Sequence, residues 1–287
     1  MRERARKPGW LRVRLRYGPS FVRTRKILSS RGLATVCEEA RCPNKGECWH
    51  MGTATFLLMG KTCTRRCGFC AVETASRGDP LDKGEADMVA EAAGELGLRY
   101  VVLTSVTRDD LPDCGAGHIS RCVRALRNTG CRVEALIPDL GAHPRALEKI
   151  VDAEPDVIGH NLETVRRLQG KVRDRRAGYD TSLSLLKRIK EVSEVYTKSS
   201  LILGLGEKEE EVLEAMADLR KAGVDFLTLG QYLRPSPRHL PVVEYVSPDK
   251  FQMYRDRALE MGFRGVASGP LVRSSYRAAA MFMEGLK

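Results

Sequence analysis

The residues with the clearest chemical potential are three cysteines in one short stretch. Cys63, Cys67 and Cys70 are separated by three and then by two residues. Thiolates at such spacing can bind several irons of a cubic iron–sulfur cluster, for which cysteine is the usual protein ligand. A structural zinc site normally closes with four ligands, and neither a histidine nor a fourth cysteine at matching spacing lies nearby. The stretch favours a cluster with one open position. The alternative is a zinc knuckle or a loop of reduced cysteines.

A second group of cysteines lies just upstream. Cys37, Cys42 and Cys48 form the pattern Cys-x4-Cys-x5-Cys, in which Pro43 and Gly46 keep the segment looped and let the sulfurs converge. This spacing fits no ordinary zinc motif and again leaves one ligand missing. The proximity of the two triads favours a shared metal chemistry, although this group alone is also compatible with free thiols.

The other cysteines and the histidines show no metal-binding spacing. We expect the scattered cysteines to be non-ligands and three of the histidines to be surface or capping residues: Cys114, Cys122, Cys131, His50, His118 and His143. No signal-peptide pattern precedes them, so the nine cysteines indicate metal ligands and buried thiols in a reducing compartment, and we expect the cytoplasm.

The elements that must position these residues alternate between strands and helices. Short apolar runs predict strands over Ala54–Met59, Tyr100–Ser105, Arg132–Ile137, Asp156–Gly159, Thr197–Leu205 and Asp225–Leu229. Helical periodicity predicts helices over Ser20–Ser30, Glu85–Leu98, Thr181–Val192, Glu209–Ala222 and Asp249–Met261. Alternation of this kind indicates an α/β fold with a parallel sheet. Six strands are fewer than the eight of a closed barrel, so we predict an open, partial (β/α)6 barrel of the TIM type.

Active sites in such barrels lie at the C-terminal ends of the strands. The loop with Cys63 follows the first predicted strand and therefore lies at this end. Thr104 and Ser105 end the second strand, and Asn161 and Glu163 follow the fourth. The amide of Asn161 and the carboxylate of Glu163 can bind ribose hydroxyls. Each loop taken singly can instead be a helix N-cap followed by a turn. A nicotinamide cofactor is not expected, because Gly204–Gly206 lacks the third glycine of a dinucleotide fingerprint.

Nearly all of the net positive charge lies on the N-terminal arm, residues 1–33. The chain has 48 basic and 37 acidic residues, and this arm contains eleven of the former and one of the latter, which leaves 37 and 36 elsewhere. Such a block indicates an acidic or polyanionic partner, or else a solvated arm that aids solubility. No apolar run is long enough to span a membrane. We divide the chain into a basic N-terminal extension over 1–52, a barrel over 53–265 and a C-terminal segment over 266–287.

These features together resemble the lipoyl synthases, a family of the radical S-adenosylmethionine (SAM) superfamily. The likeness covers about Pro8 to Ala278 and includes both triads, Phe69 before the last cysteine, and four further motifs: Thr-Ser-Val-x-Arg-Asp-Asp-Leu, His-Asn-Leu-Glu-Thr-Val, Gly-Gln-Tyr-Leu and Arg-Ser-Ser-Tyr. The resemblance implies a partial barrel with two [4Fe-4S] clusters, whose mouth is covered by the two terminal extensions. Cys63, Cys67 and Cys70 would bind the cluster that SAM chelates. Cys37, Cys42 and Cys48, with Ser275 as fourth ligand, would bind an auxiliary cluster.

The implied reaction is radical insertion of two sulfur atoms at carbons 6 and 8 of an octanoyl chain, which is amide-linked to a lysine of a lipoyl carrier domain. Implied partners are the glycine cleavage H protein, the acyltransferase subunits of 2-oxoacid dehydrogenases, and a ferredoxin or flavodoxin reductant. Neither nucleic acid nor a membrane is expected. Arg173 and Lys198 are candidate partners of the SAM carboxylate, and Ser274 is expected to cap the last helix.

Two other functions stay open at this point. A two-cluster radical SAM enzyme that methylthiolates tRNA would share the barrel, but it should carry a further RNA-binding domain, for which we find no segment. A non-enzymatic, metal-containing nucleic-acid-binding protein would explain the basic arm. Aromatic residues interleaved with the basic ones would favour it, and Trp10, Tyr17 and Phe21 are few and dispersed.

Overall fold

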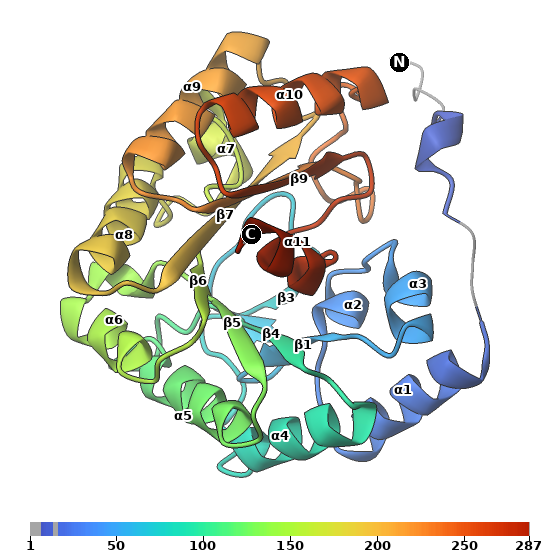
Figure 1. Ribbon diagram of the computed structural model, residues 1–287, viewed down its shortest axis with the longest axis vertical. Helices are drawn as coiled ribbons and strands as arrows, with labels where there is room; N and C mark the ends of the chain where they lie inside the picture. Colours follow the sequence, from blue (N-terminus) through green and yellow to red (C-terminus); the bar gives the residue numbers. More distant parts are fainter. Residues whose placement is uncertain (1–6, 14–16, 287) are drawn as a thin grey trace.

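Seven parallel strands form one curved sheet, a partial barrel around which the rest of the chain is arranged (Figure 1). The computed structural model describes residues 7–13 and 17–286. The strands follow the order β1-β4-β5-β6-β7-β8-β9, with bounds Thr55–Leu58, Tyr100–Ser105, Arg132–Leu136, Val157–Gly159, Tyr196–Leu203, Phe226–Gln231 and Gly265–Gly269. All six predicted strands are present to within two residues at each end. The seventh, β9, extends the sheet with residues that the sequence analysis placed almost wholly in the C-terminal segment.

Helices cover the outer face of the sheet (Figure 1). The α-helices α1 to α11 span Pro19–Ser30, Val36–Glu39, Lys45–His50, Glu85–Leu96, Ala116–Arg127, Pro144–Val151, Gln169–Val172, Tyr179–Val192, Glu209–Lys221, Pro248–Glu260 and Ala278–Gly285. Three 3-10 turns lie at Gly9–Leu11, Leu140–Ala142 and Arg166–Leu168, and two short strands, β2 (Thr62–Cys63) and β3 (Glu73–Thr74), form a separate pair. The predicted helices are confirmed, with small shifts at their ends.

Strand β4 shows how the sheet separates a core from a cavity. Val101 and Leu103 are buried in the main hydrophobic core. Tyr100, Val102 and Thr104 point to the other face, where they line an internal cavity. This is the alternation of side chains expected for a strand. Alternate residues of the strand therefore face the inside of the barrel and the helices that cover it.

The C-terminal segment runs along the inside of the barrel. A Cβ at Gly230 of β8 would lie 2.1 Å from the carbonyl oxygen of Val272, so only glycine permits this approach. Helix α11 then lies within the ring of strands (Figure 1), where Phe282 packs against Tyr100 and Phe226 at centroid distances of 5.5 and 5.9 Å. Both partners are the first residues of their strands, so α11 closes the N-terminal end of the barrel.

The predicted capping role of Ser274 is wrong. The residue before α11 is Arg277, which has a left-handed φ of 50° and makes no side-chain cap hydrogen bond. Residues 274–277 form a turn directly before the helix, and Ser274 lies four residues before Ala278, the first residue of α11, too far upstream to act as its cap.

The basic arm is partly tied to the barrel. Arg23 of α1 donates to the carbonyl oxygen of Glu95 at 2.7 Å, and Arg31 pairs with the Glu95 carboxylate at 2.7 Å. Other basic residues of the arm lie outside the described residues: Arg2, Arg4, Arg6, Arg14 and Arg16. Within the described ranges, we find no helix whose length and apolar character would let it cross a membrane.

Candidate metal and cofactor site

One cavity of about 590 Å³ inside the barrel is lined by both cysteine triads and by Ser275. Cys37 lies in α2, Cys48 in α3 and Cys42 between them. The downstream triad comes from the segment that begins with β2, and Ser275 comes from the turn before α11. Segments more than two hundred residues apart thus meet in one place. All nine cysteines are free thiols, so the six in the cavity are available as ligands.

The downstream loop leaves β1 through a tight turn. Met59 and Gly60 both have positive φ angles, 68° and 87°, which reverse the chain directly after the strand. The short β2–β3 pair then closes the base of the loop, because Cys63 lies opposite Thr74 in register. The cysteines between these two points are held in a closed loop at the C-terminal end of the sheet.

Arg65 anchors this loop to two neighbouring strand ends. Its guanidinium donates to Asp109, which follows β4, at 3.0 and 2.8 Å, and to Asp139, which follows β5, at 2.5 and 2.7 Å. Burial alone would lower the pKa of the guanidinium, but the hydrogen bonds and charges of the two carboxylates outweigh it and the pKa is raised. The sequence analysis missed this residue. The sequence shows an arginine among the cysteines and carboxylates after two strands, but it does not show that Arg65 pairs with Asp109 and Asp139.

A second set of contacts holds the far side of the loop. The backbone N–H of Asp174 donates to the Cys67 sulfur at 3.3 Å, and the Asp174 carboxylate accepts the backbone N–H of Arg66 at 2.8 Å. His239 bonds the carbonyl oxygen of Cys70 at 2.9 Å through Nε2. The protein therefore fixes the loop from several directions.

The upstream triad is joined to the C-terminal segment. Asn44 donates to the carbonyl oxygen of Leu271 at 2.7 Å, and the Tyr276 hydroxyl donates to Glu47 at 3.0 Å. Ser275 lies between these two contacts and accepts a hydrogen bond from the Thr55 hydroxyl at 2.9 Å. The turn that carries Ser275 is thus held against the segment that carries Cys37, Cys42 and Cys48.

Several thiols of the two triads are buried, and burial opposes their ionisation. Burial raises the pKa of Cys37 to about 11, and it raises those of Cys48 and Cys70 to about 12. Neighbouring cysteines contribute to the raised pKa of all three. Such thiols are protonated at neutral pH, so metal binding must displace their protons. The all-thiol donor set of each triad suits iron–sulfur clusters.

Five of the predicted SAM-binding residues lie on the same cavity: Thr104, Ser105, Asn161, Glu163 and Arg173. The Ser105 hydroxyl is buried and has no hydrogen-bond partner within the described part of the chain. Asn161 donates to the Glu163 carboxylate at 3.0 Å, and burial raises the pKa of Glu163. These groups leave polar atoms for a ligand that carries hydroxyl groups and charge.

Lys198 lies elsewhere, so its predicted contact with a SAM carboxylate is not supported. Its ammonium group pairs with Glu134 at 2.8 and 2.9 Å, and the two side chains are only 4% and 2% exposed. Glu134 also accepts from the Tyr100 hydroxyl at 2.7 Å. Spacing along the sequence could not reveal this buried partner, which satisfies the lysine charge within the barrel wall.

We expect Lys198→Met to destabilise the fold without weakening SAM binding. Removal of the lysine leaves a buried, unpaired carboxylate, which should lower the free energy of unfolding by about 3–5 kcal/mol. A double variant that also carries Glu134→Gln should recover most of this loss, because the carboxylate is then neutral. Chemical denaturation and SAM titration of the folded fraction measure the two effects. Unchanged stability together with lost SAM binding would restore the cofactor role.

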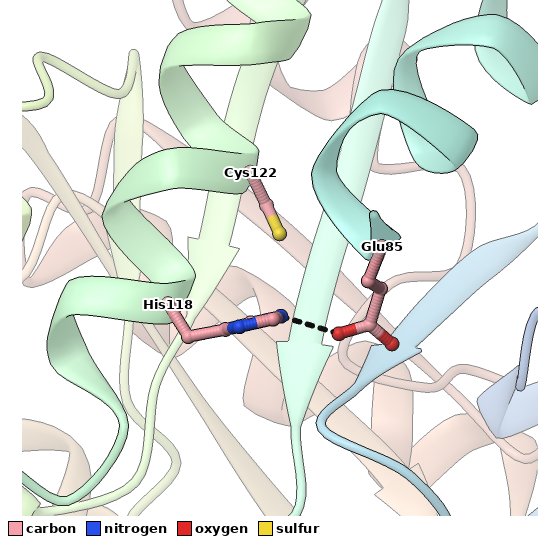
Figure 2. A group of neighbouring side chains, drawn as sticks. All are labelled: Glu85, His118 and Cys122. Atoms are coloured by element: carbon pink, nitrogen blue, oxygen red, sulfur yellow. Dashed lines mark hydrogen bonds and ion pairs between the residues drawn. The ribbon is translucent and has the colours of Figure 1, made fainter. Parts of the chain in front are cut away.

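A further group of buried side chains, Glu85, His118 and Cys122, resembles a metal site (Figure 2). His118 was expected at the surface or in a cap, but it is buried and its Nε2 donates to Glu85 at 2.5 Å. Arg121 donates to Nδ1 at 3.0 Å, so the proton of the neutral ring must lie on Nε2, the atom that a metal would need. Glu85 also accepts the backbone N–H of Met59 at 3.0 Å. We therefore interpret this group as a structural tie between α4, α5 and the end of β1.

Comparison with known proteins identifies relatives of nearly the same length. The lipoyl synthase of Anaeromyxobacter sp. strain Fw109-5 is 56% identical over 283 residues, which cover 98% of this chain and 96% of that protein. The lipoyl synthase of Pyrobaculum aerophilum is 52% identical over 282 residues, which cover 98% and 97%. That of Thermus thermophilus is 54% identical over 281 residues, which cover 97% and 87%.

The Radical SAM superfamily matches residues 57–230, a range that contains Cys63, Cys67 and Cys70 but neither the upstream triad nor Ser275. Solved structures support the fold. SuiB of Streptococcus suis, bound to S-adenosylmethionine, has a TM-score of 0.59 at 12% identity and covers 74% of this chain and 48% of its own. Methylornithine synthase has a TM-score of 0.56 at 13% identity and covers 85% and 74%.

Proposed function

This chain belongs to the lipoyl synthase family of radical SAM enzymes, and from this premise we propose which of its residues carry the reaction. The enzyme is a sulfurtransferase that inserts sulfur at carbons 6 and 8 of a protein-bound octanoyl-lysine to give the lipoyl cofactor. Its family uses a [4Fe-4S] cluster and SAM. The observation that supports the assignment of residues is the convergence of both triads and Ser275 on one cavity.

We assign the loop with Cys63, Cys67 and Cys70 to the cluster that binds SAM. The three thiolates would hold the cluster and would leave it open to the amino and carboxylate groups of SAM. When bound, this centre supplies an electron that splits SAM into methionine and a 5′-deoxyadenosyl radical, which is needed because an unactivated C–H bond offers no acidic proton to a base. Arg173 is the candidate for the SAM carboxylate, since it lines the same cavity as Cys67.

The remaining polar residues of the wall would orient the cofactor's sugar. Glu163 and Asn161 are bonded to each other, and Glu163 is fixed in place because its backbone N–H and carbonyl bond Ser200 and Ile202 of β7 at 2.9 and 2.8 Å. A carboxylate held in this way can accept hydrogen bonds from ribose hydroxyls. Thr104 and the unpartnered Ser105 hydroxyl offer further polar contacts in the same cavity.

The upstream triad and Ser275 would hold a second [4Fe-4S] cluster, which would supply the sulfur atoms of the product. A serine oxygen is a harder and weaker iron ligand than a thiolate, so the iron that it holds is the easiest to release. The Thr55 hydroxyl, which donates to Ser275 Oγ, orients that oxygen. In this proposal the N-terminal extension (1–52) and the C-terminal segment (266–287) each supply part of the second cluster site, and residues 53–265 form the barrel.

The substrate would be an octanoylated lipoyl domain, either the glycine cleavage H protein or an acyltransferase subunit of a 2-oxoacid dehydrogenase, with ferredoxin or flavodoxin as reductant. Such carriers tend to be acidic, which suits the basic arm. The arm reaches the site, because the exposed Lys7 lines the cavity. We also place the enzyme in the cytoplasm, since nine free cysteines suit a reducing compartment.

The decisive experiment is incubation of anaerobically reconstituted protein with SAM, a reductant and an octanoylated carrier peptide. The proposal requires two added sulfur atoms in the peptide by mass, together with roughly eight irons per chain. Zinc without acid-labile sulfide would instead favour a metal-containing nucleic-acid-binding protein.

Reversal of charge in the arm, as Arg12→Glu, Arg14→Glu and Arg16→Glu together, should slow association with the whole carrier protein. The expected loss is about tenfold at low ionic strength, and it should shrink with added salt because charges are screened over about 10 Å at 0.1 M. Stopped-flow association with the carrier and turnover of a short octanoylated peptide are the two measurements. Only the first should change.

A matched control reverses Lys187 and Arg188, which lie exposed on the outer helix α8. It lowers the net charge without touching the arm and should leave association nearly unchanged. Equal losses on carrier and peptide in the arm variant would indicate a structural role for the arm instead of steering.

A further inference from the structure

We propose that Arg65 is the positioning residue of the three-cysteine loop, which it locks to the ends of β4 and β5 so that the sulfurs are arranged for a cluster before metal arrives. The proposal rests on the assignment of Cys63, Cys67 and Cys70 made above and adds a residue to that site. Its neighbour Arg66 has no such role. The motif Cys-Thr-Arg-Arg-Cys alone does not distinguish the two arginines.

Arg65 is almost completely enclosed, and its hydrogen bonds are nearly saturated. The side chain is 6% exposed, and Nε, Nη1 and Nη2 make four hydrogen bonds to two carboxylates. Asp139, at 1% exposure of its side chain, depends on this partner because the buried carboxylate has few other donors: the backbone N–H of Gly141 at 3.1 Å is one. A planar fork can serve two carboxylates at once, which a lysine ammonium cannot do with the same geometry.

The backbone of Arg65 connects this anchor to the cysteine sulfurs. Its backbone N–H donates to Cys63 Sγ at 3.4 Å. The residue whose side chain is held by Asp109 and Asp139 therefore also contacts a sulfur that we assign to the cluster. The Asp174 N–H makes the equivalent contact with Cys67 at 3.3 Å. Hydrogen bonds to the sulfurs are among the factors that set the reduction potential of an iron–sulfur cluster. The position of Arg65 should therefore affect both the retention of the cluster and its reduction.

Other anchors do not replace it. Thr64 bonds Thr107 and Asp109, but these contacts reach only the end of β4. Asp174 holds the opposite side, from the segment before α8. Arg65 alone among these residues bridges two strand ends. Arg66 is exposed, and the anchor at that position is its backbone N–H, which any residue other than proline supplies.

The test compares Arg65→Lys with Arg66→Lys in full-length protein whose upstream triad carries Cys37→Ala, Cys42→Ala and Cys48→Ala, so that only the loop cluster is measured. Iron retention under a chelator, the cluster's reduction potential, and the change in its EPR spectrum on SAM addition are recorded after reconstitution. Hydrogen–deuterium exchange over residues 61–72 is recorded in metal-free protein. Arg65→Lys should lose iron about tenfold faster or more, as found for residues that orient metal ligands.

Arg65→Lys should also show a more negative potential and faster exchange in residues 61–72, with β4 and β5 protected as in the parent. Arg66→Lys should match the parent in every readout. A merely structural role would speed exchange in the strands as well, and that result would overturn the proposal. So would iron retention and loop exchange equal to the parent's. If Arg65→Lys does not fold, Asp139→Asn tests the same lock, since it weakens only one fork, and it should show the same changes in smaller degree.

The two proposals fail in different ways. Absence of any cluster from the parent, with all three loop cysteines intact, would contradict the assignment of the loop itself. A parent that binds iron and responds to SAM, together with an Arg65→Lys variant that behaves identically, contradicts only the role of Arg65.

Discussion

Cys63→Ala or Cys70→Ala is expected to abolish reductive cleavage of SAM, whereas Cys42→Ala should leave cleavage measurable and stop sulfur insertion. The first two residues lie in the loop that we assign to the SAM-binding cluster, and the third lies in the upstream triad on the same cavity. Loss of one of three protein ligands leaves the cluster too weakly held to retain its open iron. We assign the upstream triad no part in cleavage. Production of 5′-deoxyadenosine and of lipoyl peptide, measured in parallel, separates the two roles.

A buried cysteine outside the cavity provides the control. Cys131 is 8% exposed and donates from its sulfur to the carbonyl oxygen of Leu98 at 3.1 Å. Cys131→Ala should therefore affect stability modestly and neither product. Lipoyl peptide formed by Cys42→Ala at the parent rate would show that the upstream triad does not hold the sulfur-donating cluster.

Ser275→Cys should trap the second cluster. A thiolate holds iron more firmly than a serine oxygen, so the cluster should persist during turnover and release its iron slowly. SAM cleavage should continue, while lipoyl product per cluster should fall by about tenfold or more, the range seen when residues around a metal are changed. Product formation per cluster and iron release, followed in a single-turnover reaction, are the measurements.

Ser274→Ala is the matched control for this substitution. Ser274 also lines the cavity, but it neither caps α11 nor receives the Thr55 hydrogen bond that reaches Ser275. Its loss should leave product formation close to the parent level. Loss of sulfur transfer in Ser274→Ala, together with normal transfer in Ser275→Cys, would indicate that Ser274 and not Ser275 is the ligand.

Local patterns in the sequence were sufficient to predict most of the architecture and to single out the six cysteines that line one cavity. Strand β4 and helix α9 were predicted to within a residue, because apolar alternation and helical periodicity are properties of neighbouring residues. Strand β9, with the sequence Gly-Val-Ala-Ser-Gly, was missed because two glycines and one small polar residue give little strand signal. It forms because β8 offers an unpaired edge with which it can bond in register.

The site itself divides in the same way. The triads Cys37–Cys48 and Cys63–Cys70 were recognisable from the sequence because the three cysteines of each lie within one short segment, where their spacing can be read directly. The contacts that cross the barrel were decided only by the tertiary structure: Lys198 with Glu134, Arg65 with Asp109 and Asp139, His118 with Glu85, and Thr55 with Ser275. Each joins segments that are brought together by the curvature of the sheet or by the return of the C-terminal segment. A charged or polar side chain takes its role from the partner that burial gives it, and that partner has no fixed separation in sequence.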